Sequence, residues 1–121
     1  LQVRKTARFD ENEYILLLTL KAGEYTGSRV SDVDLFRIRN AMPHLAETLK
    51  KSLRPGDAVA QFSDSQYVIL LSACTYEGGM LAANRIISKF YQDHKVYRNL
   101  KIKIHIEKVK TAEHILNKYS G

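Results

Sequence analysis

Side chains able to take part in chemistry gather in one short polar stretch of this chain. Its members carry hydroxyl, carboxyl and amide groups: Ser63, Asp64, Ser65 and Gln66. The stretch joins two apolar runs, residues 58–62 and 67–71, and two such runs with a short polar link predict a β-hairpin. Because loop tips on a rigid sheet carry function more often than strands do, we expect any functional site at this hairpin tip.

The sequence shows no other reactive constellation. The histidines lie far apart along the chain and follow no metal-ligand spacing: His44, His94, His105 and His114. Ser63 and Ser65 have no neighbouring histidine to activate a hydroxyl, and the chain has no phosphate-binding glycine loop. We therefore expect no metal, no cofactor and no catalytic residue, and we expect the histidines at a surface or an interface.

Two elements precede the hairpin. Residues 13–20 are almost continuously apolar, which is typical of a strand buried on both faces. A long amphipathic helix follows, capped by Ser31 or Asp32 and ended by the turn 54–57. Its core stripe is expected at Leu35, Ile38, Met42, Leu45, Leu49 and Leu53. Pro43 either kinks this helix or begins a second one after a short helix over 32–41.

The hairpin is followed by a second helix and a last strand. The helix is expected to bury Met80, Ala83, Ile87, Phe90 and Tyr91. Residues 101–109 alternate between apolar and polar, and their lysines suit an edge strand. This βαββαβ order predicts an α+β, ferredoxin-like palm. It is an antiparallel four-stranded sheet with two helices on one face and the first and third strands in the middle.

Composition narrows the classes of partner. The net charge is +6, but lysine and arginine are spread over several segments and no helix-turn-helix or zinc finger is recognisable. We therefore expect no direct nucleic-acid binding by this domain. No apolar run approaches the ~20 residues that span a bilayer, so no membrane association is expected. A lone cysteine, Cys74, excludes an internal disulfide and favours a reducing, cytoplasmic location.

The stretch RPGDAVAQFSDSQYVILLSACTYEGG, residues 54–79, resembles GGDEF domains, the diguanylate cyclase fold. It has an Arg-x-x-Asp pattern, an aromatic residue, a five-residue tip and a hydrophobic strand, in that order. The segment Ser63-Asp64-Ser65-Gln66-Tyr67 then stands in place of the Gly-Gly-Asp-Glu-Phe signature. More narrowly, the stretch is similar to the C-terminal GGDEF-like domain of bacterial transcriptional regulators of the SARP type, which carry a bacterial transcriptional activator (BTAD) domain upstream.

The resemblance implies that cyclase activity is lost. Diguanylate cyclases hold divalent metals with acids at the end of the first strand and at the third tip position. Thr19 and Lys21 stand at the strand positions here, and Ser65 stands at the tip position. Ser63 and Asp64 replace the two glycines that let a nucleotide approach the backbone.

Two further tip residues have expected structural roles. Gln66 stands at the second tip acid and is expected to cap the hairpin turn. Tyr67 stands at the signature phenylalanine and is expected in the core, with its hydroxyl at the rim.

The first functional hypothesis is a non-catalytic regulatory or interaction domain of a bacterial transcriptional regulator. Its partners would be the upstream DNA-binding and activator domains of the same polypeptide. In this division, residues 1–12 are the tail of an upstream segment or a linker, 13–110 the GGDEF-like domain, and 111–121 a C-terminal helix or tail capped by Thr111.

Two alternatives remain open. GGDEF proteins often bear an inhibitory Arg-x-x-Asp site five residues before the tip, and Arg54 and Asp57 match it, which implies a sensor of cyclic di-GMP or another nucleotide. An arginine can grip phosphate or a guanine edge, and an aspartate can accept from guanine nitrogens. The same four residues also fit a helix-stop turn in which Asp57 bonds local backbone amides.

The third hypothesis is a homodimerisation domain that pairs through strand 101–109 or 58–62.

Overall fold

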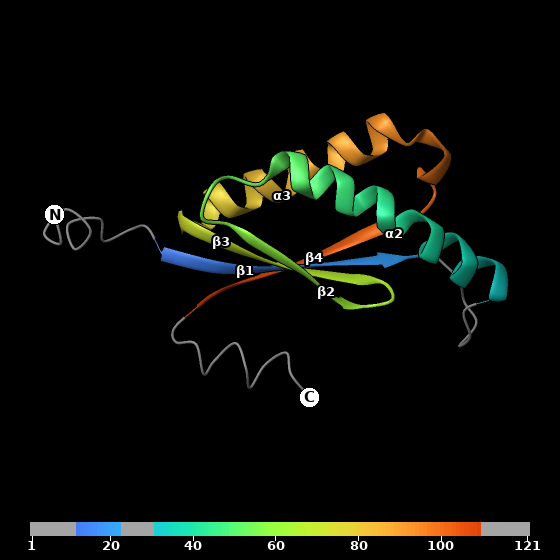
Figure 1. The fold of residues 1–121 in the computed structure, drawn as a ribbon, viewed down its shortest axis with the longest axis horizontal. Helices are drawn as coiled ribbons and strands as arrows, with labels where there is room; N and C mark the ends of the chain where they lie inside the picture. Colours follow the sequence, from blue (N-terminus) through green and yellow to red (C-terminus); the bar gives the residue numbers. More distant parts are fainter. Residues whose placement is uncertain (1–11, 23–30, 110–121) are drawn as a thin grey trace, which may run out of the picture.

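The computed structural model describes residues 12–22 and 31–109, which form a four-stranded sheet covered on one face by two helices (Figure 1). The elements are β1 (Asn12–Lys21), α2 (Asp32–Ser52), β2 (Ala58–Ser63), β3 (Gln66–Cys74), α3 (Tyr76–Asp93), the 3-10 helix η1 (Lys95–Tyr97) and β4 (Lys101–Lys108). Of the expected leading segment 1–12, residues 1–11 lie outside the described residues and Asn12 begins β1, and the expected C-terminal helix or tail over 111–121 also lies outside them.

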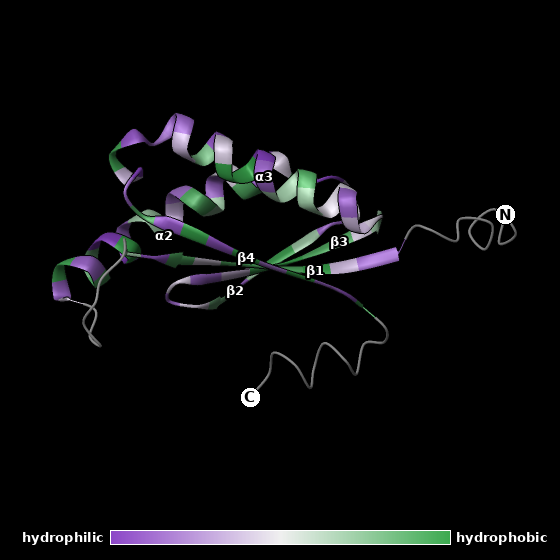
Figure 2. Cartoon of the chain, turned by 180° about the vertical axis from the view of Figure 1, so that it is seen from behind, coloured by the Kyte–Doolittle hydropathy of each residue, from purple (hydrophilic) through white to green (hydrophobic). Residues whose placement is uncertain are grey.

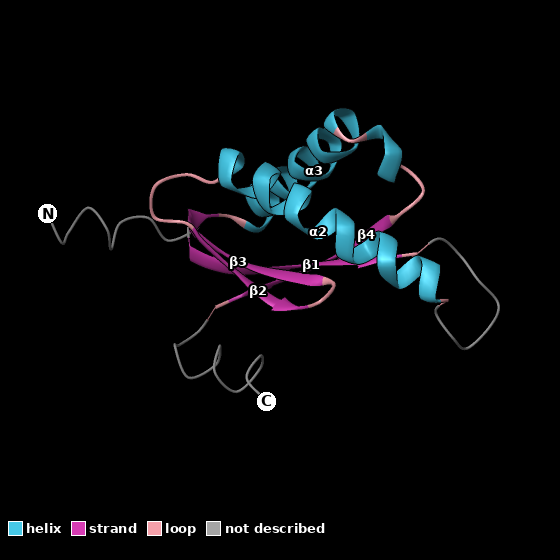
Figure 3. Cartoon of the chain, turned by 45° about the vertical axis from the view of Figure 1, so that its right-hand side comes forward, coloured by secondary structure: helices cyan, strands magenta, loops and turns pink. Residues whose placement is uncertain are grey.

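The strand order is β2-β3-β1-β4, and every neighbouring pair is antiparallel. β1 pairs on one side with β3, from Tyr14 opposite Leu71 to Thr19 opposite Gln66, and on the other side with β4. The predicted α+β, ferredoxin-like palm is therefore confirmed, with the first and third strands in the middle. β2 and β4 form the two edges of the sheet (Figure 3).

The core lies between the sheet and the two helices. Leu16, Leu18 and Leu20 of β1 are almost completely buried and share one apolar cluster with Leu45 of α2 and Phe90 of α3. Figure 2 shows the hydrophobic segments on the central strands and the mixed hydropathy along both helices. Among the described helices, none combines the length and hydrophobicity that crossing a membrane requires.

α2 is one uninterrupted helix of 21 residues with Pro43 inside it. The Ser31 hydroxyl caps it by accepting a hydrogen bond from the Asp34 N–H at 3.1 Å. The alternative of a separate short helix over 32–41 is wrong. Met42, Leu45 and other buried residues on both sides of the proline face the same core, so tertiary packing overrides the loss of one helical hydrogen bond.

Several expected core positions are less buried than the sequence predicts, and Leu53, Met80 and Tyr91 are only partly buried. Leu35 is 47% exposed, because the first turns of α2 extend past the ends of the strands (Figures 1 and 3). In α3 the buried isoleucine is Ile86, whereas Ile87 is only partly buried. Ile86 lies three residues after Ala83 and four before Phe90, and this spacing places all three on one face of the helix.

Candidate functional site

The hairpin tip is tighter than the sequence predicted. Only Asp64 and Ser65 form the turn, while Ser63 and Gln66 pair with each other as the last residues of β2 and the first of β3. Four polar residues in a row suggested a four-residue link, but two of them belong to the strand ladder. The short turn leaves little free backbone with which the tip could enclose a ligand.

Hydrogen bonds tie this tip to the end of β1. The Ser63 hydroxyl donates to Gln66 Oε1 at 2.8 Å and accepts from the Ser65 N–H at 3.3 Å. The Gln66 side-chain amide donates to Thr19 Oγ1 at 3.1 Å, and the Leu20 N–H donates to the Ser65 carbonyl at 2.8 Å. Gln66 therefore closes the hairpin turn, the role expected of it, and also joins the turn to the central strand.

Tyr67 anchors the tip to α2. Its ring is 7% exposed, and its hydroxyl donates a 3.0 Å hydrogen bond to the Met42 carbonyl. Burial raises the pKa of the Tyr67 phenol above its ordinary value, so the group stays a neutral donor. The expected core position of this ring is confirmed, and its hydroxyl fixes the tip against the helix layer.

The structure brings the tip and the end of β1 side by side, as a metal-binding pair of acidic positions would require. Thr19 pairs directly with Gln66, and Lys21 is exposed at the end of the same strand. Within 17–21 and 63–67 the only carboxylate is Asp64, which is exposed. These side chains offer hydroxyls, an amide, one acid and one amine, and no pair of carboxylates.

The second candidate pair, Arg54 and Asp57, forms a locked turn between α2 and β2. One carboxylate oxygen of Asp57 accepts from the Arg54 backbone N–H at 2.9 Å and lies 3.5 Å from Arg54 Nε. The other accepts from the backbone N–H and the hydroxyl of Ser72, at 3.0 and 3.2 Å. The Arg54 guanidinium also donates to the Ser72 carbonyl. Ser72, which no sequence signal singled out, thus joins this turn to β3.

Burial and hydrogen bonding act in opposite directions on Asp57. Its side chain is 2% exposed, and this desolvation alone would raise the carboxyl pKa. The backbone hydrogen bonds from Ser72 and Arg54, together with the Arg54 charge, outweigh it and hold the pKa of Asp57 below its ordinary value. Both oxygens of Asp57 are engaged within the chain, so the turn matches the helix-stop interpretation of these residues.

Gly56 completes the turn. Its φ of 97° lies in the left-handed region, which side chains other than glycine rarely adopt. A Cβ at this position would also lie 3.0 Å from the Ser72 hydroxyl. A cleft of about 190 Å³ lies beside the turn, and Arg54, Asp57 and Arg85 are among its lining residues.

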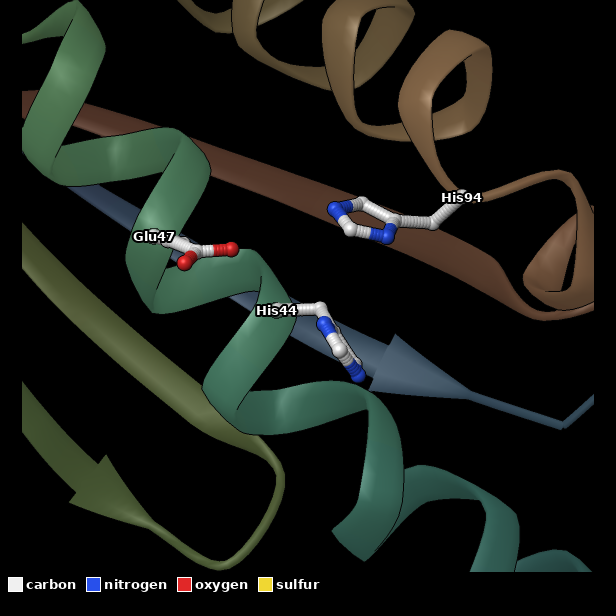
Figure 4. Close-up of side chains that lie close together, drawn as sticks. All are labelled: His44, Glu47 and His94. Carbon is white, nitrogen blue, oxygen red and sulfur yellow. The ribbon is translucent and has the colours of Figure 1, made fainter.

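The fold also brings together residues that lie far apart in the sequence. His44 of α2 and His94 after α3 have ring centroids 4.7 Å apart, and Glu47 lies beside them (Figure 4). His105 instead lies on β4, 2.8 Å from Glu107. The spacing of 50 residues between the first two histidines matches no metal motif, so only the packing of the two helices could reveal this cluster.

Comparison with known proteins supports the fold. No protein-family model matches the chain, and no curated protein matches it significantly. A solved structure described as a DGC protein from Thermotoga maritima superposes with a TM-score of 0.54 at 16% identity, covering 98% of this chain and 85% of that one. At this identity the likeness shows that the chain shares its fold with that DGC protein.

The locked turn predicts a pH-dependent stability. We expect Asp57→Asn to lower the free energy of unfolding by about 1–3 kcal/mol near neutral pH, because charge-assisted hydrogen bonds to two segments are weakened. Since the folded pKa of Asp57 is depressed, its contribution is complete above the ordinary pKa of an aspartate. It is lost as the pH falls through the folded value, so the difference from the wild type should shrink below pH ~4.

Urea unfolding followed by circular dichroism at several pH values measures this difference. The matched control is Asp64→Asn at the exposed hairpin turn, which should change stability by no more than ~0.5 kcal/mol. Equal effects of the two substitutions at neutral pH would contradict the role assigned to Asp57.

Proposed function

We propose that this domain is a non-catalytic regulatory or interaction module with the diguanylate cyclase fold, within a bacterial transcriptional regulator. The observation that carries the proposal is the composition of the tip and the adjoining end of β1. There, one exposed carboxylate, Asp64, is accompanied by a lysine, Lys21, and by side chains already hydrogen-bonded to each other.

Cyclase chemistry requires more negative charge than the hairpin tip and the end of β1 supply. Divalent cations such as Mg²⁺ take oxygen ligands, and carboxylates are their usual protein partners around a triphosphate. Lys21 adds a positive charge where the resemblance places a metal-binding acid. A metal at this position would meet repulsion instead of coordination, and a triphosphate would arrive without its bridging ions.

The polar groups of the tip also form hydrogen bonds within the chain. Ser63, Gln66 and Thr19 form a chain of side-chain hydrogen bonds, and the Ser65 carbonyl is paired with the Leu20 N–H. A nucleotide would have to break these bonds to reach the backbone, at a cost of roughly 1 kcal/mol for each neutral bond lost. The arrangement suits a rigid surface that contacts protein partners.

The regulatory context rests on the resemblance of the tip and of the strand after it to the SARP-type domains. In this proposal the upstream domains of the same polypeptide contact DNA and activate transcription. The present domain contacts those domains and transmits or restrains their activity. Such a role needs no cofactor, and it places the protein in the cytoplasm.

The proposal predicts that the domain does not convert GTP to cyclic di-GMP in the presence of Mg²⁺ or Mn²⁺. Chromatographic analysis of the nucleotides after long incubation checks this, with Asp64→Asn as the paired sample because Asp64 is the remaining acid at the tip. Product formed by the wild type and abolished in Asp64→Asn would overturn the proposal. Equal traces in both samples would come from a contaminating enzyme.

A second candidate function is nucleotide sensing at the turn between α2 and β2. The observation in its favour is that Arg54 and Arg85 line one cleft, where two guanidinium groups can meet phosphate. Against it, Asp57 and Arg54 already hold Ser72, and a ligand would compete with those contacts.

We expect no heat of binding when cyclic di-GMP is titrated into the domain. The reason is that both carboxylate oxygens of Asp57 are already occupied. A micromolar signal that vanishes in Arg54→Ala and persists in the control Arg39→Ala, an exposed residue of α2, would establish the sensor function instead.

A further inference from the structure

α2 and the end of α3 bring two imidazoles and one carboxylate to a single point on the surface. His44 and Glu47 lie on α2 beside His94, which follows the last turn of α3 (Figure 4). One ligand atom from each of these three residues lies within 4.8 Å of the others. The cluster is on the helix layer, apart from the hairpin tip and the turn described above.

The backbone holds all three positions firmly. His44 and Glu47 lie three residues apart inside α2, so they share one face of the helix. His94 is the residue at which α3 ends, and its N–H donates to the Phe90 carbonyl at 2.9 Å. The packing of α2 against α3 therefore sets the spacing of the three side chains.

Small side-chain movements bring these groups to coordination distance. Zn²⁺ binds imidazole nitrogen and carboxylate oxygen at about 2.0–2.2 Å, which separates tetrahedral ligands by about 3.4 Å. His44 and Glu47 are exposed, so rotation of their side chains can close the gap of about 1.4 Å between the 4.8 Å separation and such a geometry.

We propose that His44, Glu47 and His94 form a binding site for a divalent transition metal of the Zn²⁺ class. Two imidazoles and one carboxylate are a donor set suited to zinc, cobalt or nickel. Magnesium and calcium prefer sites built from oxygen ligands. Three protein ligands leave at least one coordination position for water or another small ligand.

The surroundings of the site favour an anion at that open position. Glu47 and His94 line a cleft of about 310 Å³ whose other walls include Lys51, Arg85 and Lys89. Of these, Lys89 lies 3.6 Å from Asp93, which also lines the cleft. A carboxylate or phosphate bound to the metal would meet positive charge on its far side.

Aromatic packing offers a competing explanation for the paired histidines. His94 lies 5.5 Å from the Phe90 ring, and His44 lies 5.7 Å from the Tyr97 ring, measured between centroids. Such stacking would bring the imidazoles together without any metal. It does not involve the Glu47 carboxylate, so a dependence of metal affinity on Glu47 separates the two explanations.

Isothermal titration of the untagged full chain with ZnCl₂ and, separately, MgCl₂ tests the proposal. We expect one equivalent of Zn²⁺ to bind and Mg²⁺ to give no comparable signal. Losing one ligand should weaken Zn²⁺ binding by at least the ~10- to 100-fold that supporting residues of metal sites typically contribute. This loss is expected in His44→Ala, His94→Ala and Glu47→Gln, while His105→Ala, a histidine on β4, should bind as the wild type does.

Thermal unfolding and Co²⁺ absorption give independent readouts. Zn²⁺ should raise the thermal midpoint of the wild type and of His105→Ala only, since binding to the folded state stabilises it. Visible d–d bands of bound Co²⁺ should disappear in Glu47→Gln. If the His94→Ala variant does not fold, the Zn²⁺ affinity of Glu47→Gln decides whether the site exists, because Glu47 is exposed. Absence of Zn²⁺ binding, or an affinity unchanged within twofold in His44→Ala and Glu47→Gln, would overturn the site.

Discussion

The structure depends on the burial of β1 between two partner strands and beneath two helices. Its leucines fill the space under α2 and α3, and its backbone is hydrogen-bonded on both edges, to β3 and to β4. The face of β1 that carries Leu16, Leu18 and Leu20 is almost completely buried under the helices, which suits a strand in the middle of the sheet. Once β1 is central, the hairpin must pair on one side and β4 on the other. The end of β1 then lies beside the hairpin tip.

This placement explains how the tip is held in place. The fold brings the end of a central strand against a hairpin turn. In this chain the same proximity is used for hydrogen bonds between Gln66 and Thr19 and between Leu20 and Ser65. Tyr67 adds a bond to α2 and Asp57 a second link between the hairpin and the helix end. These polar groups stabilise the tip.

The sequence predicted the elements well because periodicity reports burial, and burial decides strand order here. It placed Leu35 in the core because periodicity does not reveal where a helix extends past its sheet. The sequence could not predict which residues the candidate site residues contact. Ser72 lies in β3, and no sequence motif singles it out. Its carbonyl accepts a hydrogen bond from the Arg54 guanidinium, and its N–H donates one to the Asp57 carboxylate. His44 and His94 meet only through the packing of two helices, which a spacing rule cannot express.

The most direct test of the central claim is a nuclear magnetic resonance titration of the ¹⁵N-labelled domain with GTP and Mg²⁺. We expect no saturable shift of the backbone amides at the tip and the end of β1, because these positions carry no pair of carboxylates to recruit the metal and their hydrogen bonds are already formed within the chain. Saturable shifts confined to Thr19, Leu20, Ser65 and Gln66 would contradict the non-catalytic role and would show that the tip binds the nucleotide.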